Sequence, residues 1–209
     1  MRWIVIGAAG KMGKIVCELL HERHEEFYEI DFESIDFFEQ ADIIVDFSTA
    51  ESREKYIKFA LEQKIPYACF STGLGEKDEK MFEKLSQDVP VLICSNASNG
   101  MQTMFEITKI ASQMMPQAEI VLQEYHHKHK KDSPSGTAKI LLEILKNHKV
   151  DSASFRVGNE VGIHKVQFFI NDEVLEISHR ANARSTFACG AIEMATKLMK
   201  KEKGLYKSI

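Results

Sequence analysis

The chain has 209 residues, a length that allows one good hydrophobic core or two small ones. Hydrophobic residues make up 44% of it and charged residues 28%, which excludes a disordered or fibrous protein. The formal net charge is −4 with both signs interspersed, and no apolar run approaches a membrane span, so we expect neither a nucleic-acid partner nor a membrane.

Four cysteines, Cys17, Cys69, Cys94 and Cys189, are scattered without CxxC spacing. A chain with enough core does not need disulfides, so we interpret them as reduced, mostly buried thiols. The first residues carry too short an apolar run for a secretory signal and lack a small-residue cleavage site. These features predict a cytoplasmic protein.

The first half of the chain alternates strand-like and helix-like segments. An apolar run over residues 2–6 is followed at once by a glycine-rich turn and a helical pattern that includes residues 15–20. Further strands are predicted over residues 27–31, 42–47, 67–70 and 91–94, with helices over 51–63 and 76–87. This alternation is typical of a doubly wound parallel sheet, and we predict a dinucleotide-binding domain over residues 1–97.

The second half changes its pattern. Apolar positions recur at helical spacing over residues 101–115, and a strand (119–125), a loop (126–135), a helix (136–147) and two alternating strands (165–170 and 174–178) follow. Antiparallel strands with segregated helices indicate an α+β domain over residues 98–183. A last helical pattern, 186–200, is predicted to return to the first domain as part of residues 184–209. The predicted fold is α/β, a Rossmann-type domain plus a smaller α+β substrate and oligomerisation domain with a mostly antiparallel sheet.

The glycine turn has the form G-x-x-G-x-x-G, with Gly7, Gly10 and Gly13 between a strand and a helix. Such glycines let the backbone approach a pyrophosphate, while the helix N-terminus supplies N–H groups and partial positive charge. A tight βα turn without a ligand is the alternative. Asp31, at the end of the second predicted strand, is the candidate partner of the ribose hydroxyls, or else a solvated loop acid. Because no Arg or Lys follows Asp31 closely and an acid repels a 2′-phosphate, NADH should serve at least as well as NADPH.

Residues 124–138 carry the densest chemistry. The segment Pro-Ser-Gly-Thr over residues 134–137 enters a helix and offers hydroxyls and backbone N–H groups, which form a natural anion site. The imidazoles and ammonium groups before it are suited to hold a dianionic substrate and to deliver a proton near neutral pH. Three alternatives remain. The first is a zinc site, although no nearby residues complete its ligand set. The second is a solvated basic turn without a function. The third is a nucleophilic Ser135, although this serine lies in no G-x-S-x-G elbow.

This segment resembles the signature E-x-H-H-x-x-K-x-D-x-P-S-G-T-A of the dihydrodipicolinate reductase family at every fixed position. The glycine turn with its methionine, the strand over residues 45–48, the run over 179–191 and the ending 204–206 are also similar to that family, in the same order. The resemblance therefore covers essentially the whole chain.

The resemblance implies an NADH- or NADPH-dependent reductase in diaminopimelate and lysine biosynthesis. It reduces 4-hydroxy-tetrahydrodipicolinate, a cyclic dicarboxylate, to tetrahydrodipicolinate with loss of water, and is a homotetramer built through its sheet. Carried onto this sequence, His126 is the proton donor and Lys130 the second catalytic or substrate-binding cation. The implied substrate-carboxylate residues are His127, Ser135, Gly136 and Thr137. The cofactor set is Gly7, Gly10, Lys11, Met12, Gly13, Asp31, Ser71, Thr72, Gly73, Ser95, Asn96 and Ala97, and no metal is expected.

Two segments depart from the family pattern. Residues 70–73 read Phe-Ser-Thr-Gly where the family has Gly-Thr-Thr-Gly, and Ala97 stands where it has Phe. One hypothesis is that Phe70 supplies from the other side the ring that Ala97 lacks. Because the substrate motif is intact, these changes are expected to affect cofactor affinity and rate rather than reaction type.

Two other functions stay open at this point. The altered segments also suit a reductase of a related cyclic imine or keto acid, which a substrate panel would separate. A non-catalytic dinucleotide-binding sensor is a further alternative, since fold alone does not fix function. The presence of both His126 and Lys130 favours catalysis, because a sensor needs no proton donor beside an anion site.

Overall fold

The computed structural model describes residues 1–31, 41–71 and 73–207. The chain divides into two compact units, Met1–Ala97 with Phe187–Ile209 (unit 1) and Ser98–Thr186 (unit 2). Unit 1 therefore takes in both ends of the chain, and unit 2 is one continuous middle segment. Within the described residues, no helix combines the length and the apolar character needed to cross a membrane.

Unit 1 contains a six-stranded sheet in the order β10-β5-β4-β3-β1-β2, with every neighbouring pair parallel. The predicted parallel α/β sheet is confirmed. Its strands are β1 (Arg2–Ile6), β2 (Glu26–Ile30), β3 (Ile43–Asp46), β4 (Tyr67–Cys69), β5 (Pro90–Ile93) and β10 (Gly204–Tyr206). Its helices are α1 (Lys11–Glu22), α2 (Ala50–Gln63), α3 (Glu76–Leu85) and most of α6 (Ser185–Leu198).

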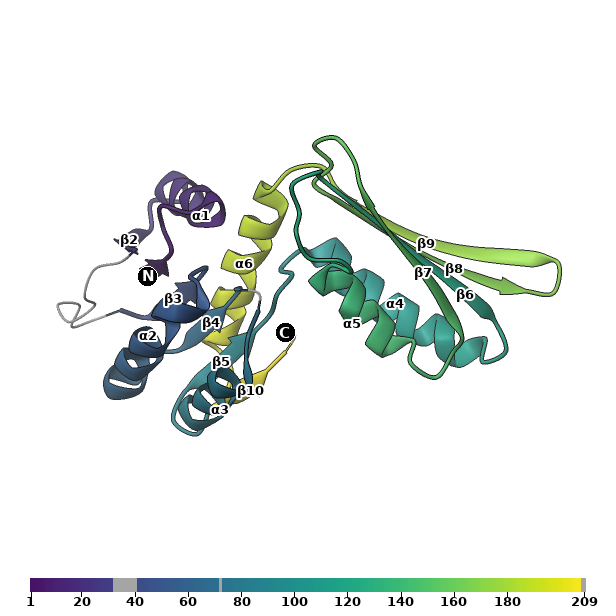
Figure 1. Ribbon diagram of the computed structural model, residues 1–209. Helices are drawn as coiled ribbons and strands as arrows, with labels where there is room; N and C mark the ends of the chain where they lie inside the picture. The colour runs from purple at the N-terminus through teal and green to yellow at the C-terminus, as the bar shows by residue number, and fades with distance from the viewer. Residues whose placement is uncertain (32–40, 72, 208–209) are drawn as a thin grey trace. The chain divides into compact units, whose positions relative to one another are not determined.

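The sheet of unit 1 is covered on both faces, which explains its near-continuous apolar strands. One buried cluster joins it to α1 and α6, and a second joins it to α2 and α3 (Figure 1). Strand order reverses between β1 and β3, so the segments that follow these two strands diverge at one edge of the sheet. In open α/β sheets this switch point is where ligands bind.

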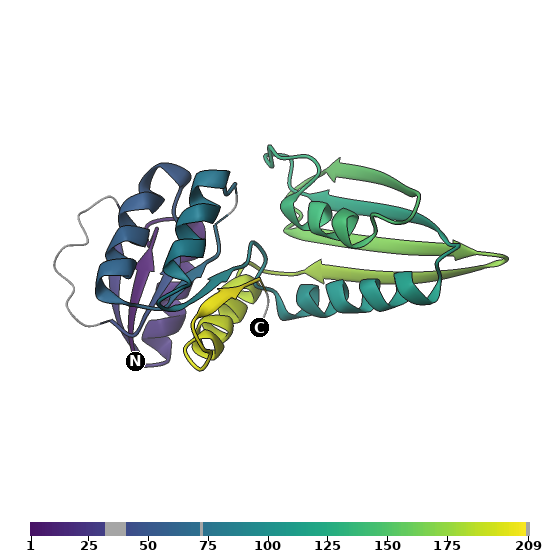
Figure 2. The ribbon, with the colours of Figure 1, turned by 90° about the horizontal axis from the view of Figure 1, so that it is seen from below.

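Unit 2 contains a four-stranded sheet in the order β7-β6-β8-β9. Its elements are α4 (Asn99–Met114), β6 (Glu119–His126), α5 (Gly136–Ile144), β7 (Val150–Arg156), β8 (Gly162–Ile170) and β9 (Glu173–Ala181). The β6–β8 and β8–β9 pairs are antiparallel, whereas β6–β7 is parallel, so the sheet is mixed. Helices α4 and α5 cover one face of it (Figures 1 and 2).

Strands β7 and β10 were not predicted from the sequence. Both are edge strands, and the segment Val-Asp-Ser-Ala-Ser-Phe-Arg of β7 has no buried residue. Because an edge strand can pair through its backbone while its side chains stay solvated, it lacks the apolar alternation that identifies a half-buried strand. The stronger alternation of β6, where even-numbered residues are buried, identified that strand correctly.

Candidate active site

The glycine turn is built from close backbone approaches. Gly7 has a φ of +78°, and a Cβ added there would lie 2.9 Å from the carbonyl oxygen of Phe47. A Cβ on Gly13 would lie 2.1 Å from the carbonyl oxygen of Gly7. Both positions therefore need glycine to form the turn, and the turn lies against the end of β3 at the switch point.

Helix α1 begins directly after this turn, with Gly10 as its N-cap. In the part of the chain that the structure describes, no side chain caps the helix, and its first turn carries no acidic residue. First-turn N–H groups and the helix dipole therefore favour an anion here. Lys11 and Met12 open the helix, and Gly13 is buried beneath them.

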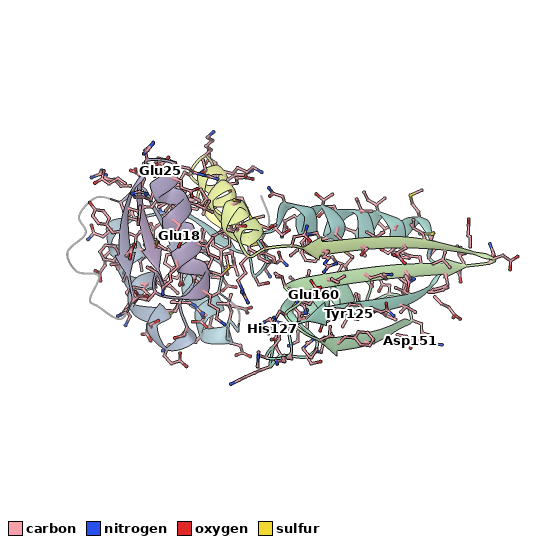
Figure 3. The ribbon with its side chains drawn as sticks, turned by 90° about the horizontal axis from the view of Figure 1, so that it is seen from above. Glu18, Glu25, Tyr125, His127, Asp151 and Glu160 are labelled. Atoms are coloured by element: carbon pink, nitrogen blue, oxygen red, sulfur yellow. The ribbon has the colours of Figure 1, made fainter. Side chains whose placement is uncertain are left out.

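Asp31 lies beside the glycine turn. Its carboxylate oxygens accept hydrogen bonds from the backbone N–H of Ala9, at 2.8 and 3.0 Å. Together with Glu29 and with Glu18 of α1, which is labelled in Figure 3, it lines an acidic groove of unit 1. The candidate ribose partner is thus joined to the candidate pyrophosphate turn.

The remaining candidate cofactor residues follow β4 and β5, whose carboxyl ends share an edge of the sheet with β1 and β3. Ser71 is buried and donates a hydrogen bond to the carbonyl oxygen of Ser48 at 2.8 Å. Gly73 has a φ of +73°, and among the described residues nothing lies within 4 Å of a Cβ added to it. Ser95 is exposed, Asn96 and Ala97 are buried, and Thr72 lies outside the described residues.

Phe70 is buried and stacks on Phe47, with ring centroids 5.4 Å apart. Phe70 and Ala97 belong to the same apolar cluster of unit 1. The large ring of Phe70 is therefore accommodated within the core at the ends of β3 and β4.

In unit 2, the carboxylate of Glu124 is the centre of a buried network. Arg156 donates to it through both terminal nitrogens, at 3.1 and 2.8 Å, and the backbone N–H of Ser135 donates at 3.1 Å. Nδ1 of His126 also contacts it. Burial opposes ionisation of Glu124, but hydrogen bonds from Arg156 and Ser154 outweigh burial and lower its pKa to about 2. Glu124 is therefore a carboxylate at any physiological pH.

His126 ends β6 and is 8% exposed. Burial lowers the pKa of its imidazole, and the neighbouring charge of Glu124 offsets only part of this. Lys130 and Arg156 lower that pKa further. The neutral imidazole is therefore favoured near neutral pH, and a negative charge bound beside His126 would favour its protonated form.

Ser135 is the N-cap of α5, and its Oγ accepts a hydrogen bond from the N–H of Ala138 at 3.2 Å. The same Oγ lies 3.2 Å from Nε2 of His164. Burial holds the pKa of His164 at about 3, so this imidazole is neutral. A neutral His164 with hydrogen on Nε2 would donate to Ser135 Oγ, which leaves the serine hydroxyl hydrogen available to donate to a ligand.

The other predicted substrate residues lie on the same loop and helix. The ammonium of Lys130 forms an ion pair with the carboxylate of Asp132 at 2.8 Å. The backbone N–H of Lys130 donates to the carbonyl oxygen of His127. Gly136 opens α5 and Thr137 is buried in its first turn. Figure 3 shows His127 at the end of β6. The structure thus gathers all six predicted unit 2 residues around the loop from β6 to α5.

Three residues of this network were not among the predicted site residues: Glu124, which opens the motif over residues 124–138, Arg156 and His164. Glu124 is two residues before His126 on a strand, so period-2 alternation places both on one face. Arg156 belongs to the unpredicted β7, and no local signal connects it to Glu124. Ligand atoms of Glu124, His126 and His164 lie within 4.8 Å of one another, but the guanidinium of Arg156 already neutralises Glu124 and would repel a metal cation.

Comparison with known proteins covers both units. Residues 1–97 match the family described as dihydrodipicolinate reductase, N-terminus, and residues 100–209 match dihydrodipicolinate reductase, C-terminus. The chain is 36% identical over 207 residues to the 4-hydroxy-tetrahydrodipicolinate reductase of Thermosipho africanus, covering 99% of this chain and 95% of the relative. The Campylobacter jejuni protein of the same name is 32% identical over 229 residues, covering 97% and 95%.

A solved structure supports the fold. The dipicolinate-bound dihydrodipicolinate reductase from Paenisporosarcina sp. matches with a TM-score of 0.77 at 15% identity, covering 100% of this chain and 97% of that one. Aspartate semialdehyde dehydrogenase II of Vibrio cholerae matches less closely, with a TM-score of 0.59 at 12% identity, covering 96% of this chain and 98% of that one. At these sequence identities the two structures support the fold assignment alone.

Proposed function

This chain is an oxidoreductase of the dihydrodipicolinate reductase family, and we propose that it reduces 4-hydroxy-tetrahydrodipicolinate to tetrahydrodipicolinate with loss of water, using NADH or NADPH. One observation carries the proposal. Glu124 joins the imidazole of His126 to the N-terminus of α5, so that a proton donor and a carboxylate-binding site stand together. A reductase of a small cyclic dicarboxylate needs both.

The cofactor fits the described residues of unit 1. The uncapped first turn of α1 and the glycines at positions 7, 10 and 13 would hold a pyrophosphate, and Asp31 would take ribose hydroxyls. Ser71, Thr72, Gly73 and residues 95–97 would lie toward the nicotinamide. When bound, NADH or NADPH supplies the hydride.

Unit 2 would bind the substrate and supply the proton. Ser135, Gly136 and Thr137 would hold one carboxylate at the N-terminus of α5, with His127 beside them. Lys130 would exchange Asp132 for the second carboxylate. Because a dianion beside His126 favours the imidazolium, substrate binding itself would charge the proton donor that burial keeps largely neutral.

Cofactor choice follows from charge. Glu29 and Asp31 both line the groove beside the glycine turn, and two carboxylates there would repel a 2′-phosphate. We therefore expect NADH to be used at least as well as NADPH.

A coupled assay tests the function. Dihydrodipicolinate synthase would generate the unstable substrate in situ, and loss of NADH or NADPH absorbance would be followed after this protein is added. Oxidation that depends on this protein supports the reductase. With a folded protein and an active control reductase, no oxidation with either cofactor rejects it, and a panel of cyclic imines and keto acids then tests the related reductase.

We further propose a homotetramer built through the open face of the unit 2 sheet, acting in the cytoplasm. Tyr125, labelled in Figure 3, stacks on Phe155 on this face, with ring centroids 4.5 Å apart. By strand register Phe169 and Val174 lie on the same face, and they are 39% and 50% exposed. A second copy of the chain that packs its own sheet on this face would bury these side chains. The cysteines are thiols, in keeping with a reducing compartment. Light scattering that gives a monomer would reject the tetramer.

A further inference from the structure

Glu124 is neither the proposed proton donor nor a proposed substrate ligand, yet it contacts both groups. One carboxylate oxygen accepts the N–H of Ser135, and the other contacts Nδ1 of His126. Its side chain is 1% exposed, so solvent does not compete for these contacts. A single buried carboxylate therefore connects the two halves of the unit 2 site.

We propose that Glu124 is a positioning residue that, balanced by Arg156, fixes His126 as a proton donor through Nε2 and holds it in register with the substrate-carboxylate site. The inference rests on the proposed function and deepens it. It assigns a role to Glu124, which opens the substrate motif but was given no role there, and to Arg156, which lies outside that motif.

The first step of the argument is the tautomer of His126. An ionised carboxylate can only accept hydrogen bonds, so the contact with Glu124 requires the hydrogen on Nδ1. The proton delivered to substrate must then leave from Nε2. Gly162 lies against this nitrogen, and a Cβ there would stand 3.2 Å from Nε2. Glycine thus leaves this side of the imidazole without a side chain.

The second step is the balance of charge around His126. The groups that face it are Glu124, Arg156, Lys130 and the neutral His164. Alone, the buried Glu124 carboxylate would stabilise the imidazolium and hold back its proton. The bidentate Arg156 offsets that charge, so that the imidazolium remains acidic enough to give its proton to the substrate.

The third step is the coupling to substrate. Arg156 also donates to the carbonyl oxygen of Asp132, at 2.6 Å, in the loop that carries Lys130. Glu124 accepts the N–H of Ser135, three residues further along the same loop. The pair therefore fixes the part of the loop that leads into α5 against the strand that carries His126.

The test uses Glu124→Gln, Arg156→Gln and the double variant that combines these two substitutions. Glu143→Gln is measured beside them. Glu143 is the matched control, since it is an acid of unit 2 in an exposed pair with Lys146. Two readouts are taken, the pH profile of kcat/KM and the NMR titration of the His126 imidazole, assigned by its loss in His126→Gln. The NMR titration needs no turnover.

The two single variants should shift the pKa of His126 in opposite directions. Removing the Glu124 charge lowers it by about one to three units, and the alkaline limb of the profile moves to lower pH. Removing the Arg156 charge raises it, and the limb moves to higher pH. Glu124→Gln should also lower kcat roughly 10-fold or more, part of the roughly 10²–10⁴-fold that a positioned proton donor contributes. Glu143→Gln should match wild type.

A merely structural role predicts something else. Shifts in the same direction, or shifts no larger than those of Glu143→Gln, would overturn the proposal. Each single variant leaves one buried charge unpaired and can fail to fold, whereas the double variant leaves none. Because Glu124 contacts His126 directly, the double variant should still lower the pKa of His126 and kcat, and wild-type values there would also overturn the proposal.

The failure of this inference is distinguishable from failure of the proposed function. A wild-type protein without reductase activity rejects the function, yet the NMR titration still reports on Glu124 and Arg156. Wild-type activity with an unmoved His126 titration in all three variants rejects only the positioning role.

Discussion

The candidate cofactor site in unit 1 and the candidate substrate site in unit 2 are built from different groups. The cofactor site, around Gly7, Gly10 and Gly13, consists of backbone, and its candidate ligand groups are N–H donors at a helix N-terminus. The substrate site, around His126, consists of side chains held by Glu124 and Arg156. A backbone site depends on the absence of side chains, whereas a side-chain site depends on partners from distant strands. The two should therefore respond to mutation in different ways.

His126→Gln tests the candidate substrate site most strongly. We expect kcat to fall by roughly 10²- to 10⁴-fold, since the variant has no titrating proton donor, while NADH affinity changes little. Steady-state kinetics and calorimetric titration of NADH measure the two quantities. Wild-type turnover would refute the role of His126.

Gly13→Ala tests the candidate cofactor site. The added Cβ would lie 2.1 Å from the Gly7 carbonyl oxygen, and the clash should cost about 1–3 kcal/mol of stability and weaken NADH binding about 10- to 100-fold. Thermal unfolding and NADH titration measure both. Gly75→Ala is the matched control, because no described residue lies within 4 Å of a Cβ added there. Equal NADH affinity in both variants would contradict a backbone-built cofactor site.

Ser135→Ala should affect the candidate substrate site less than His126→Gln does. It removes the cap of α5, worth about 1 kcal/mol, and a hydroxyl for the substrate carboxylate. KM should rise about 10-fold with a lesser change in kcat, because the contact is already made in the bound substrate. Ser86→Ala, on an exposed turn of unit 1, serves as control. An unchanged KM would remove Ser135 from the substrate site.

Asp31→Asn should have the smallest effect and concerns cofactor choice. Loss of one carboxylate near a 2′-phosphate is worth about 1 kcal/mol in solvent, so the NADPH to NADH ratio of kcat/KM should rise about 5-fold. The ratio of initial rates in the coupled assay measures this. Asp88→Asn, distant from the glycine turn in sequence, is the control. An unchanged ratio would mean that Asp31 does not read the ribose.

Much of this site could be predicted from sequence because its signals are local. The glycine spacing lies between one strand and the next helix, and the loop from His126 to Ser135 carries its donors within ten residues. Asp31 follows from strand order in a Rossmann unit. The predicted strand at Arg2–Ile6 and the parallel sheet around it are confirmed.

Arg156 and His164 could not be found in the same way. Arg156 lies 32 residues from Glu124 in sequence, on an edge strand without apolar alternation. It reaches Glu124 only because β7 pairs with β6 in parallel, which puts Arg156 beside His126 in register. His164 lies opposite Glu124 because β8 runs antiparallel to β6. Strand pairing, and not spacing, assembles the network.

The sequence by itself determined the α/β fold class and the family, and it predicted candidate residues for cofactor and substrate, because these depend on periodicity, glycine spacing and one contiguous motif. The tertiary structure decided which side chains support them. A hydrogen bond to a buried carboxylate forms only when folding brings its donors together and removes water. No local pattern in the sequence predicts such a contact between distant residues. The contacts of Glu124 with His126 and Arg156, and of His164 with Ser135, therefore became visible only in the folded molecule.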